Sequence, residues 1–114
     1  MAVEISAVPE LLRPLWQERA PRILERIVTV ERALRQQSDS EREEGLRQAH
    51  KLHGLLGTFG FQEGSRVAGV AEELLEANDS SRAGWAAAAD ACEHLLQELT
   101  VLVNQSNEDG ESEE

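Results

Sequence analysis

Two histidines and two glycines recur within residues 49–60 at spacings that place them on one face of a helix. His50, His53, Gly54 and Gly57 stand at positions i, i+3, i+4 and i+7, which are neighbours on a helical surface. Glycine costs about 0.5–1 kcal/mol in a helix interior relative to alanine, so helix stability does not explain this pair. Bare backbone beside an imidazole leaves room for a bulky group. The pattern therefore predicts a nucleophilic histidine displayed on a helix surface.

His50 is the residue that we take as the reacting group. An imidazole has an ordinary pKa of about 6.5, so at neutral pH one ring nitrogen carries a free lone pair. If the following turn centres on residues 60–61, the position opposite His50 on the next helix is 71 or 72. Glu72 is the polar residue there, and we predict that it accepts a hydrogen bond from the ring and orients it. The alternative is that Glu72 is simply one of many exposed glutamates.

Apolar spacing predicts the helices that position this face. A short helix from Val8 to Arg19 ends or kinks at Pro21. A longer helix follows from about Pro21 to Gln37. The residues expected on the buried sides of these two helices are Leu11, Leu12, Leu15 and Trp16, and then Ile23, Ile27, Val30 and Leu34.

The histidine-bearing helix is predicted from about Glu41 to Thr58 or Phe59. Ser40 followed three residues later by Glu43 is typical of a capping box at its start. Gly60 is placed to end the helix in a left-handed conformation. The residues expected on its buried side are Leu46, Ala49, Leu52, Leu56 and Phe59.

Two further helices complete the predicted fold, one from about Gln62 to Ala77 and one from near Arg82 to about Asn104, with a loop at residues 78–81. Their expected buried residues are Val67, Val70, Ala71 and Leu74, and then Trp85, Ala88, Cys92, Leu95, Leu99 and Leu102. This pattern predicts an all-α domain over residues 1–105, an antiparallel up-down-up-down four-helix bundle with a short extra N-terminal helix. Residues 106–114 are acidic and apolar-poor, which predicts a disordered tail.

Composition narrows the class of protein. The formal net charge is −11 over 114 residues; the tail carries five of these charges, which leaves about −6 on the bundle. A bundle that is this acidic argues against nucleic acid and membrane surfaces as partners. No apolar stretch approaches the roughly 18–20 residues of a membrane span, and the N-terminus lacks signal-peptide features, so we expect a cytoplasmic protein. A single cysteine excludes intramolecular disulfides and cysteine-rich zinc sites.

The histidine segment resembles the signature of the histidine-containing phosphotransfer (HPt) domains of two-component phosphorelays. The matching features are Ala49-His50, the apolar Leu52, the His53-Gly54 pair and the Phe59-Gly60 pair that closes the helix. The following stretch, residues 68–76, is similar to the family's next helix. The resemblance extends over the bundle layout of residues 21–104, but about a dozen positions are diagnostic.

The resemblance implies that His50 is phosphorylated. A phosphoryl group would pass between this histidine and the aspartate of a response-regulator receiver domain, with a sensor histidine kinase as a further partner. The receiver would bring the metal ion, so the HPt chain itself needs no cofactor and is a carrier, not an autonomous enzyme. Such a module is expected to be monomeric. Gly54 and Gly57 would leave room for the partner.

One position departs from the family pattern. The family usually has a lysine three residues after its histidine, where this chain has His53, and the lysine stands instead at Lys51. A protonated His53 would replace that charge, as would Arg47, one turn before His50 on the same face. The substitution also makes His53 an alternative acceptor of the phosphoryl group.

Two other functions compete with the phosphoryl carrier. The first is a pseudo-HPt module that binds receiver or kinase partners without phosphorylation, and the His53 substitution is its motivation. The second is a small metal-binding bundle, in which His50, His53 and Glu72 would form a two-histidine, one-carboxylate ligand set. Ligands from other helices are not evident for such a site, so we expect no metal.

Overall fold

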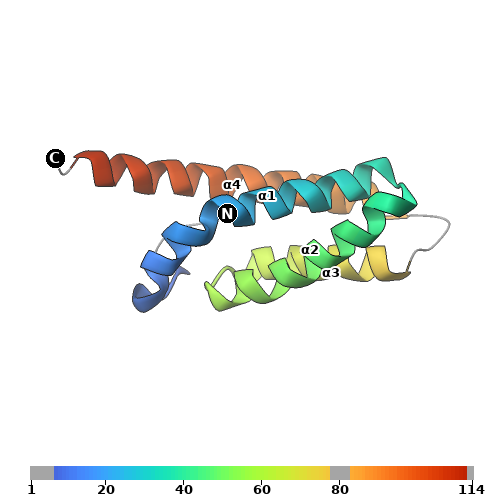
Figure 1. Ribbon diagram of the computed structural model, residues 1–114, viewed down its shortest axis with the longest axis horizontal. Coiled ribbons are helices and arrows are strands. Elements are labelled where there is room, and N and C mark those ends of the chain that lie inside the picture. Colours follow the sequence, from blue (N-terminus) through green and yellow to red (C-terminus); the bar gives the residue numbers. More distant parts are fainter. Residues whose placement is uncertain (1–6, 78–82, 113–114) are drawn as a thin grey trace.

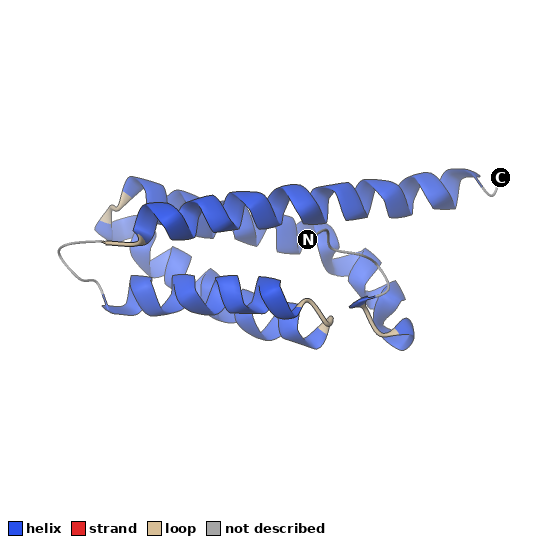
Figure 2. Ribbon diagram, turned by 180° about the vertical axis from the view of Figure 1, so that it is seen from behind, coloured by secondary structure: helices blue, strands red, loops and turns tan. Residues whose placement is uncertain are grey.

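The computed structural model describes residues 7–77 and 83–112 of the chain. A 3₁₀ turn, η2 (Glu10–Leu12), precedes four helices: α1 (Arg13–Gln36), α2 (Asp39–Thr58), α3 (Gln62–Ala77) and α4 (Trp85–Ser112). Helices α1 and α2 lie in front in Figure 1, and α4 and α3 lie in front in the reverse view of Figure 2. The predicted all-α, four-helix bundle is confirmed, and residues 7–77 and 83–112 contain no strand.

Helix α1 joins the two segments that the sequence predicts as separate helices. It continues through Pro21, and Figure 1 shows it bending within its N-terminal half. A proline inside a helix removes one backbone hydrogen bond and crowds the preceding turn, which bends a helix that packing holds together on both sides. Here Trp16 and Ala20, before the proline, and Ile23, after it, are all buried. The expected short extra helix is therefore the first part of α1.

The buried side of this first part differs from the prediction. Leu11 is 94% exposed and Leu15 is also exposed, whereas Trp16 is fully buried. Trp16 and Ala20 continue the spacing of Ile23, Ile27, Val30 and Leu34, all of which are buried as predicted. One helix can bury only one such stripe, so Leu15 of α1 faces outward. Leu11 and Leu12 lie in η2, before α1 begins, and Leu12 is half-buried against the core.

Three aromatic rings close the bundle at the turn between α2 and α3. Trp16 packs edge-on against Phe59 and Phe61, with ring centroids 5.4 and 4.9 Å apart. Between the two phenylalanines, Gly60 has a φ of +89°, the left-handed conformation that its position predicts. A Cβ there would lie 2.0 Å from the carbonyl oxygen of Ala7. Only glycine fits this turn, which sets the alignment of α3 along α2.

Helix α2 begins two residues before its predicted start. Its N-cap is Ser38, whose side chain accepts a hydrogen bond from the backbone N–H of Glu41, rather than Ser40 with Glu43. A close crossing with α1 follows at Gly45, where a Cβ would lie 2.4 Å from that of Ala33. The predicted buried residues of α2 are confirmed except Leu46, which is half-buried.

Helices α3 and α4 differ from the prediction at their edges. The apolar stripe of α3 lies along Val67, Ala68, Ala71 and Leu75, so Val70 is exposed and Leu74 half-buried. On α4 all six predicted seam residues are buried. This helix starts at Trp85, because Gly84 has a left-handed φ of +87°, and the predicted loop at residues 78–81 lies outside the described residues.

Helix α4 also continues to Ser112, through most of the segment expected to be a disordered tail. Adding a residue to an existing helix gains a backbone hydrogen bond without a new nucleation cost, and no proline interrupts this stretch. Within the ranges that the structure describes, no helix combines the length and apolar character needed to cross a membrane.

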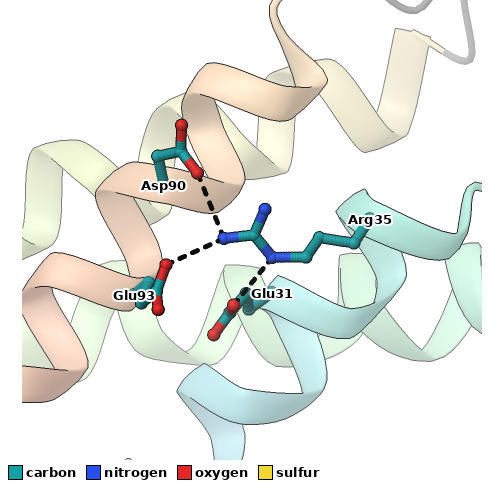
Figure 3. A network of polar contacts seen from close by, with 4 residues as sticks. All are labelled: Glu31, Arg35, Asp90 and Glu93. Atoms are coloured by element: carbon teal, nitrogen blue, oxygen red, sulfur yellow. Dashed lines mark hydrogen bonds and ion pairs between the residues drawn. The ribbon is translucent and has the colours of Figure 1, made fainter.

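An ion-pair cluster fastens α1 to α4 on the surface. Arg35 of α1 contacts Glu31 on its own helix at 2.8 Å and, across the interface, Asp90 and Glu93 of α4, both at 3.1 Å (Figure 3). Both helices are therefore held near the end of the bundle where α1 turns into α2.

Candidate functional site

The α2–α3 hairpin brings His50 and Glu72 together. His50 Nδ1 lies 2.6 Å from Glu72 Oε2, which is the contact that the hairpin alignment predicts. The His50 side chain is 76% exposed and that of Glu72 only 20%. A largely buried carboxylate therefore holds a ring that stands in solvent.

The carboxyl group of Glu72 is ionised at neutral pH. Its hydrogen bond with His50 is the largest cause that lowers its pKa from the usual 4.5; partial burial opposes the shift, and the contact with His53 adds to it. Because an ionised carboxylate only accepts hydrogen bonds, the proton of the contact belongs to Nδ1 of His50. The arrangement fixes the tautomer of the ring.

His53 contacts the other oxygen of the same carboxylate. Its Nδ1 lies 3.4 Å from Glu72 Oε1, and its side chain is 52% exposed, less than that of His50. The ring is seated against α3 at Gly69, where a Cβ would lie 3.2 Å from Cε1 and 3.4 Å from Nε2 of His53. The two histidines thus share a partner but differ in how freely each can be reached.

The two glycines that follow His50 on α2, Gly54 and Gly57, differ in their surroundings. A Cβ on Gly54 would meet nothing within 4 Å, so this position is open, as predicted. At Gly57, a Cβ would lie 3.4 Å from Ser65 Oγ of α3. The hydroxyl of Ser65 donates a 2.8 Å hydrogen bond to the carbonyl oxygen of His53. Gly57 therefore faces α3 and makes room for a contact between the helices, which corrects the expectation that it points outward.

Of the two predicted cationic neighbours, Arg47 and Lys51, the first pairs with another carboxylate and the second acts on it through its charge. Arg47 forms an ion pair with Glu44. A hydrogen bond from Gln48 is the largest cause that lowers the pKa of Glu44, and Arg47 and Lys51 lower it further. Both cations are exposed. The positive charges of Arg47 and Lys51 therefore stabilise the ionised carboxylate of Glu44, one turn before Gln48.

Sequence reasoning missed Ser65, Gly69 and the buried Gln48, which also accepts a hydrogen bond from Arg26 of α1. A signal for the first two was present. The alignment that pairs His50 with Glu72 also pairs His53 with Gly69 and Gly57 with Ser65, since each step forward on α2 is an equal step back on α3. Gln48 stands four residues before Leu52 and eight before Leu56, on the buried side of α2, but its polar side chain does not indicate burial.

The residues proposed as a metal site do not form one in the structure. Over residues 7–77 and 83–112, no group of three or more histidine, cysteine, aspartate or glutamate side chains is arranged to hold a metal ion. The two imidazoles instead contact separate oxygens of Glu72 through Nδ1.

Comparison with known proteins gives one match. The sequence model of the Hpt domain matches residues 13–105, from the first residue of α1 into α4. No curated protein and no solved structure matches the chain.

Proposed function

The chain belongs to the Hpt domain family, and we propose that it carries a phosphoryl group on His50, to or from the aspartate of a receiver domain. Hpt domains are histidine phosphotransfer modules of phosphorelays, which work with response regulators or kinases. One observation carries the assignment to His50. Its Nδ1 is bound by the Glu72 carboxylate at 2.6 Å, while the side chain stays 76% exposed.

The contact with Glu72 prepares the other ring nitrogen for attack. With the Nδ1 proton donated to Glu72, the lone pair lies on Nε2. In the transfer, Nε2 bonds to the phosphorus of an aspartyl phosphate on the receiver. The bond from phosphorus to the aspartate oxygen breaks, and its electron pair returns to that carboxylate. The ring becomes positively charged, its Nδ1 proton stays in place, and the nearby negative charge of Glu72 stabilises it.

His50 is better suited to this reaction than His53. Its Nδ1 is closer to Glu72, at 2.6 Å against 3.4 Å, and its side chain is more exposed. One face of the His53 ring is covered by α3 at Gly69, so this ring is less freely reached than that of His50. We assign His53 as a neighbour of the site and not as the acceptor.

The surrounding residues serve the approach of a partner. Gly54 leaves open backbone one turn after His50. Arg47, Lys51 and a protonated His53 are the cations that would offset the phosphoryl charge. The chain acts as a carrier and not as an enzyme. We propose that the protein is a monomer, since its four helices bury a continuous apolar core within one chain. We also propose that it acts in the cytoplasm.

Intact-mass spectrometry tests the assignment. The full chain is incubated with a phosphorylated receiver domain at neutral pH, as wild type, His50→Gln, His53→Gln and His94→Gln, the last being an exposed histidine on α4. We expect one acid-labile phosphoryl group on every variant except His50→Gln. Receiver binding without phosphoryl uptake by the wild type would contradict the carrier and favour a pseudo-Hpt module.

A further inference from the structure

Glu72 contacts two histidines at once, one through each carboxylate oxygen. Oε2 accepts from His50 at 2.6 Å, and Oε1 lies 3.4 Å from Nδ1 of His53. A glutamate carboxylate rotates easily about its last side-chain bond. Because its two oxygens are rigidly linked, holding one of them fixes the direction of the other.

His53 is itself held by α3 at two further points. Its ring packs closely against α3 at Gly69, where a Cβ would lie 3.2 Å from Cε1, so a larger residue there would crowd the ring. Its backbone carbonyl accepts the 2.8 Å hydrogen bond from Ser65. The backbone of His53 is therefore tied to α3 and one face of its ring is covered by Gly69, an arrangement that suits the ring to hold the carboxylate of Glu72.

We propose that His53 is a positioning residue that acts through Glu72. By engaging Oε1, it directs Oε2 toward Nδ1 of His50, which in the neutral ring favours the tautomer whose lone pair lies on Nε2. The role of His53 in phosphoryl transfer rests on the proposed function. Its effect on the orientation of Glu72 and on the tautomer of His50 is a property of the free protein. In this role the imidazole of His53 needs no positive charge. It would need one to replace the lysine that the family usually has at this position.

Side-chain ¹⁵N NMR of the free, full-length protein at pH 8 measures the effect directly. An imidazole is ordinarily neutral at that pH, and its two tautomers give distinct nitrogen shifts. We compare wild type, His53→Ala, His53→Gln and His94→Ala. The glutamine amide can still donate to Glu72, whereas the alanine cannot.

In wild type, we expect His50 to carry its proton mainly on Nδ1. His53→Ala should lower the ratio of the Nδ1–H to the Nε2–H form by about three- to tenfold, the scale of one partly exposed hydrogen bond. His53→Gln should restore most of the ratio, and His94→Ala should leave it unchanged. A ratio in His53→Ala equal to that of wild type, in a protein with an unchanged thermal unfolding transition, overturns the proposal.

Phosphoryl uptake from the receiver supplies the second measurement. We expect His53→Ala to slow it by about three- to tenfold and His53→Gln to restore it, as the tautomer ratio does. Equal slowing by both variants with an unchanged tautomer ratio would show that His53 acts directly, and would overturn the positioning role. If wild type takes up no phosphoryl group, the proposed function fails, while the NMR comparison still decides the inference.

Discussion

At the scale of single residues, the site depends on which ring nitrogen of His50 carries the proton. The contacts with His50 and His53 lower the pKa of Glu72 below its usual 4.5, and the ionised carboxylate determines in turn which nitrogen of His50 carries hydrogen. In the proposed transfer, a phosphorylated receiver aspartate would present an electrophilic phosphorus, and the lone pair on Nε2 of His50 would attack it. In that proposal the nucleophile is a histidine together with its carboxylate.

Glu72→Gln tests this pairing through its dependence on pH. The pKa of Glu72 is lowered in the folded protein. Its ionised form therefore adds stability that is fully present above the ordinary value of 4.5 and is lost as pH falls through the folded-state pKa. We expect wild type to be more stable than Glu72→Gln at pH 7, and the difference to shrink in urea unfolding at pH 3.5.

Phosphoryl uptake by Glu72→Gln should also fall, by about tenfold, because an amide carries no charge to stabilise the phosphorylated ring. A stability difference that grows toward low pH would show that the carboxylate is not held by the histidines.

Much of the arrangement of single residues at the site is predictable from the sequence. His50 and Glu72 follow from helix spacing and an assumed turn, because both depend only on local geometry. Gln48 does not, since a polar residue is expected at the surface. Its burial depends on Arg26 from another helix, which supplies a hydrogen bond that no local pattern reveals.

At the scale of the elements, the α2–α3 hairpin is built from matched pairs. Glycine on one helix repeatedly faces a larger group on the other: Gly69 faces the His53 ring and Gly57 faces Ser65. The expectation that Gly54 and Gly57 both leave room for a partner does not fit Gly57, because a mid-helix glycine looks the same in sequence whether it faces solvent or a neighbouring helix.

Gly54→Ala and Gly69→Ala form a matched pair that separates these roles. Alanine at position 54 meets nothing within 4 Å, so we expect it to raise the free energy of unfolding by about 0.5–1 kcal/mol through helix propensity. Alanine at position 69 presses its Cβ to 3.2 Å from the His53 ring, so its gain should be smaller or reversed. Urea unfolding of both variants gives the comparison. Equal gains in the free energy of unfolding would contradict the close contact between the His53 ring and α3 at Gly69.

At the scale of the whole molecule, two helix pairs are joined by different means. The α2–α3 hairpin holds the site through short contacts across one tight turn, whereas α1 and α4 are distant in sequence and are fastened on the surface by Arg35. Element order, the buried stripe of α1 after Pro21 and the seam of α4 are predictable from apolar spacing. The continuity of α1 through Pro21 is not, because tertiary packing outweighs the local cost of the proline.

Arg35→Gln tests the fastening between α1 and α4. Arg35 contacts Asp90 and Glu93 across the interface, whereas Arg22 pairs only with Glu25 on its own helix. We expect Arg35→Gln to lower the thermal unfolding midpoint more than Arg22→Gln at low ionic strength. The difference should shrink in 1 M salt, where the screening length is about 3 Å. Midpoints that are equal at low salt would show that the cluster does not join the helices.

The tight turn at Gly60 has one more consequence, which concerns insertions rather than substitutions. If the turn kept its geometry and one residue added after it joined α3, each position of α2 would face a residue about 100° around α3 from its present partner. Glu72, Gly69 and Ser65 would then leave their partners together, although every functional side chain would still be encoded. Loop length is therefore as much a part of this site as its histidines, and relatives that retain the residues but alter the loop would not retain the arrangement.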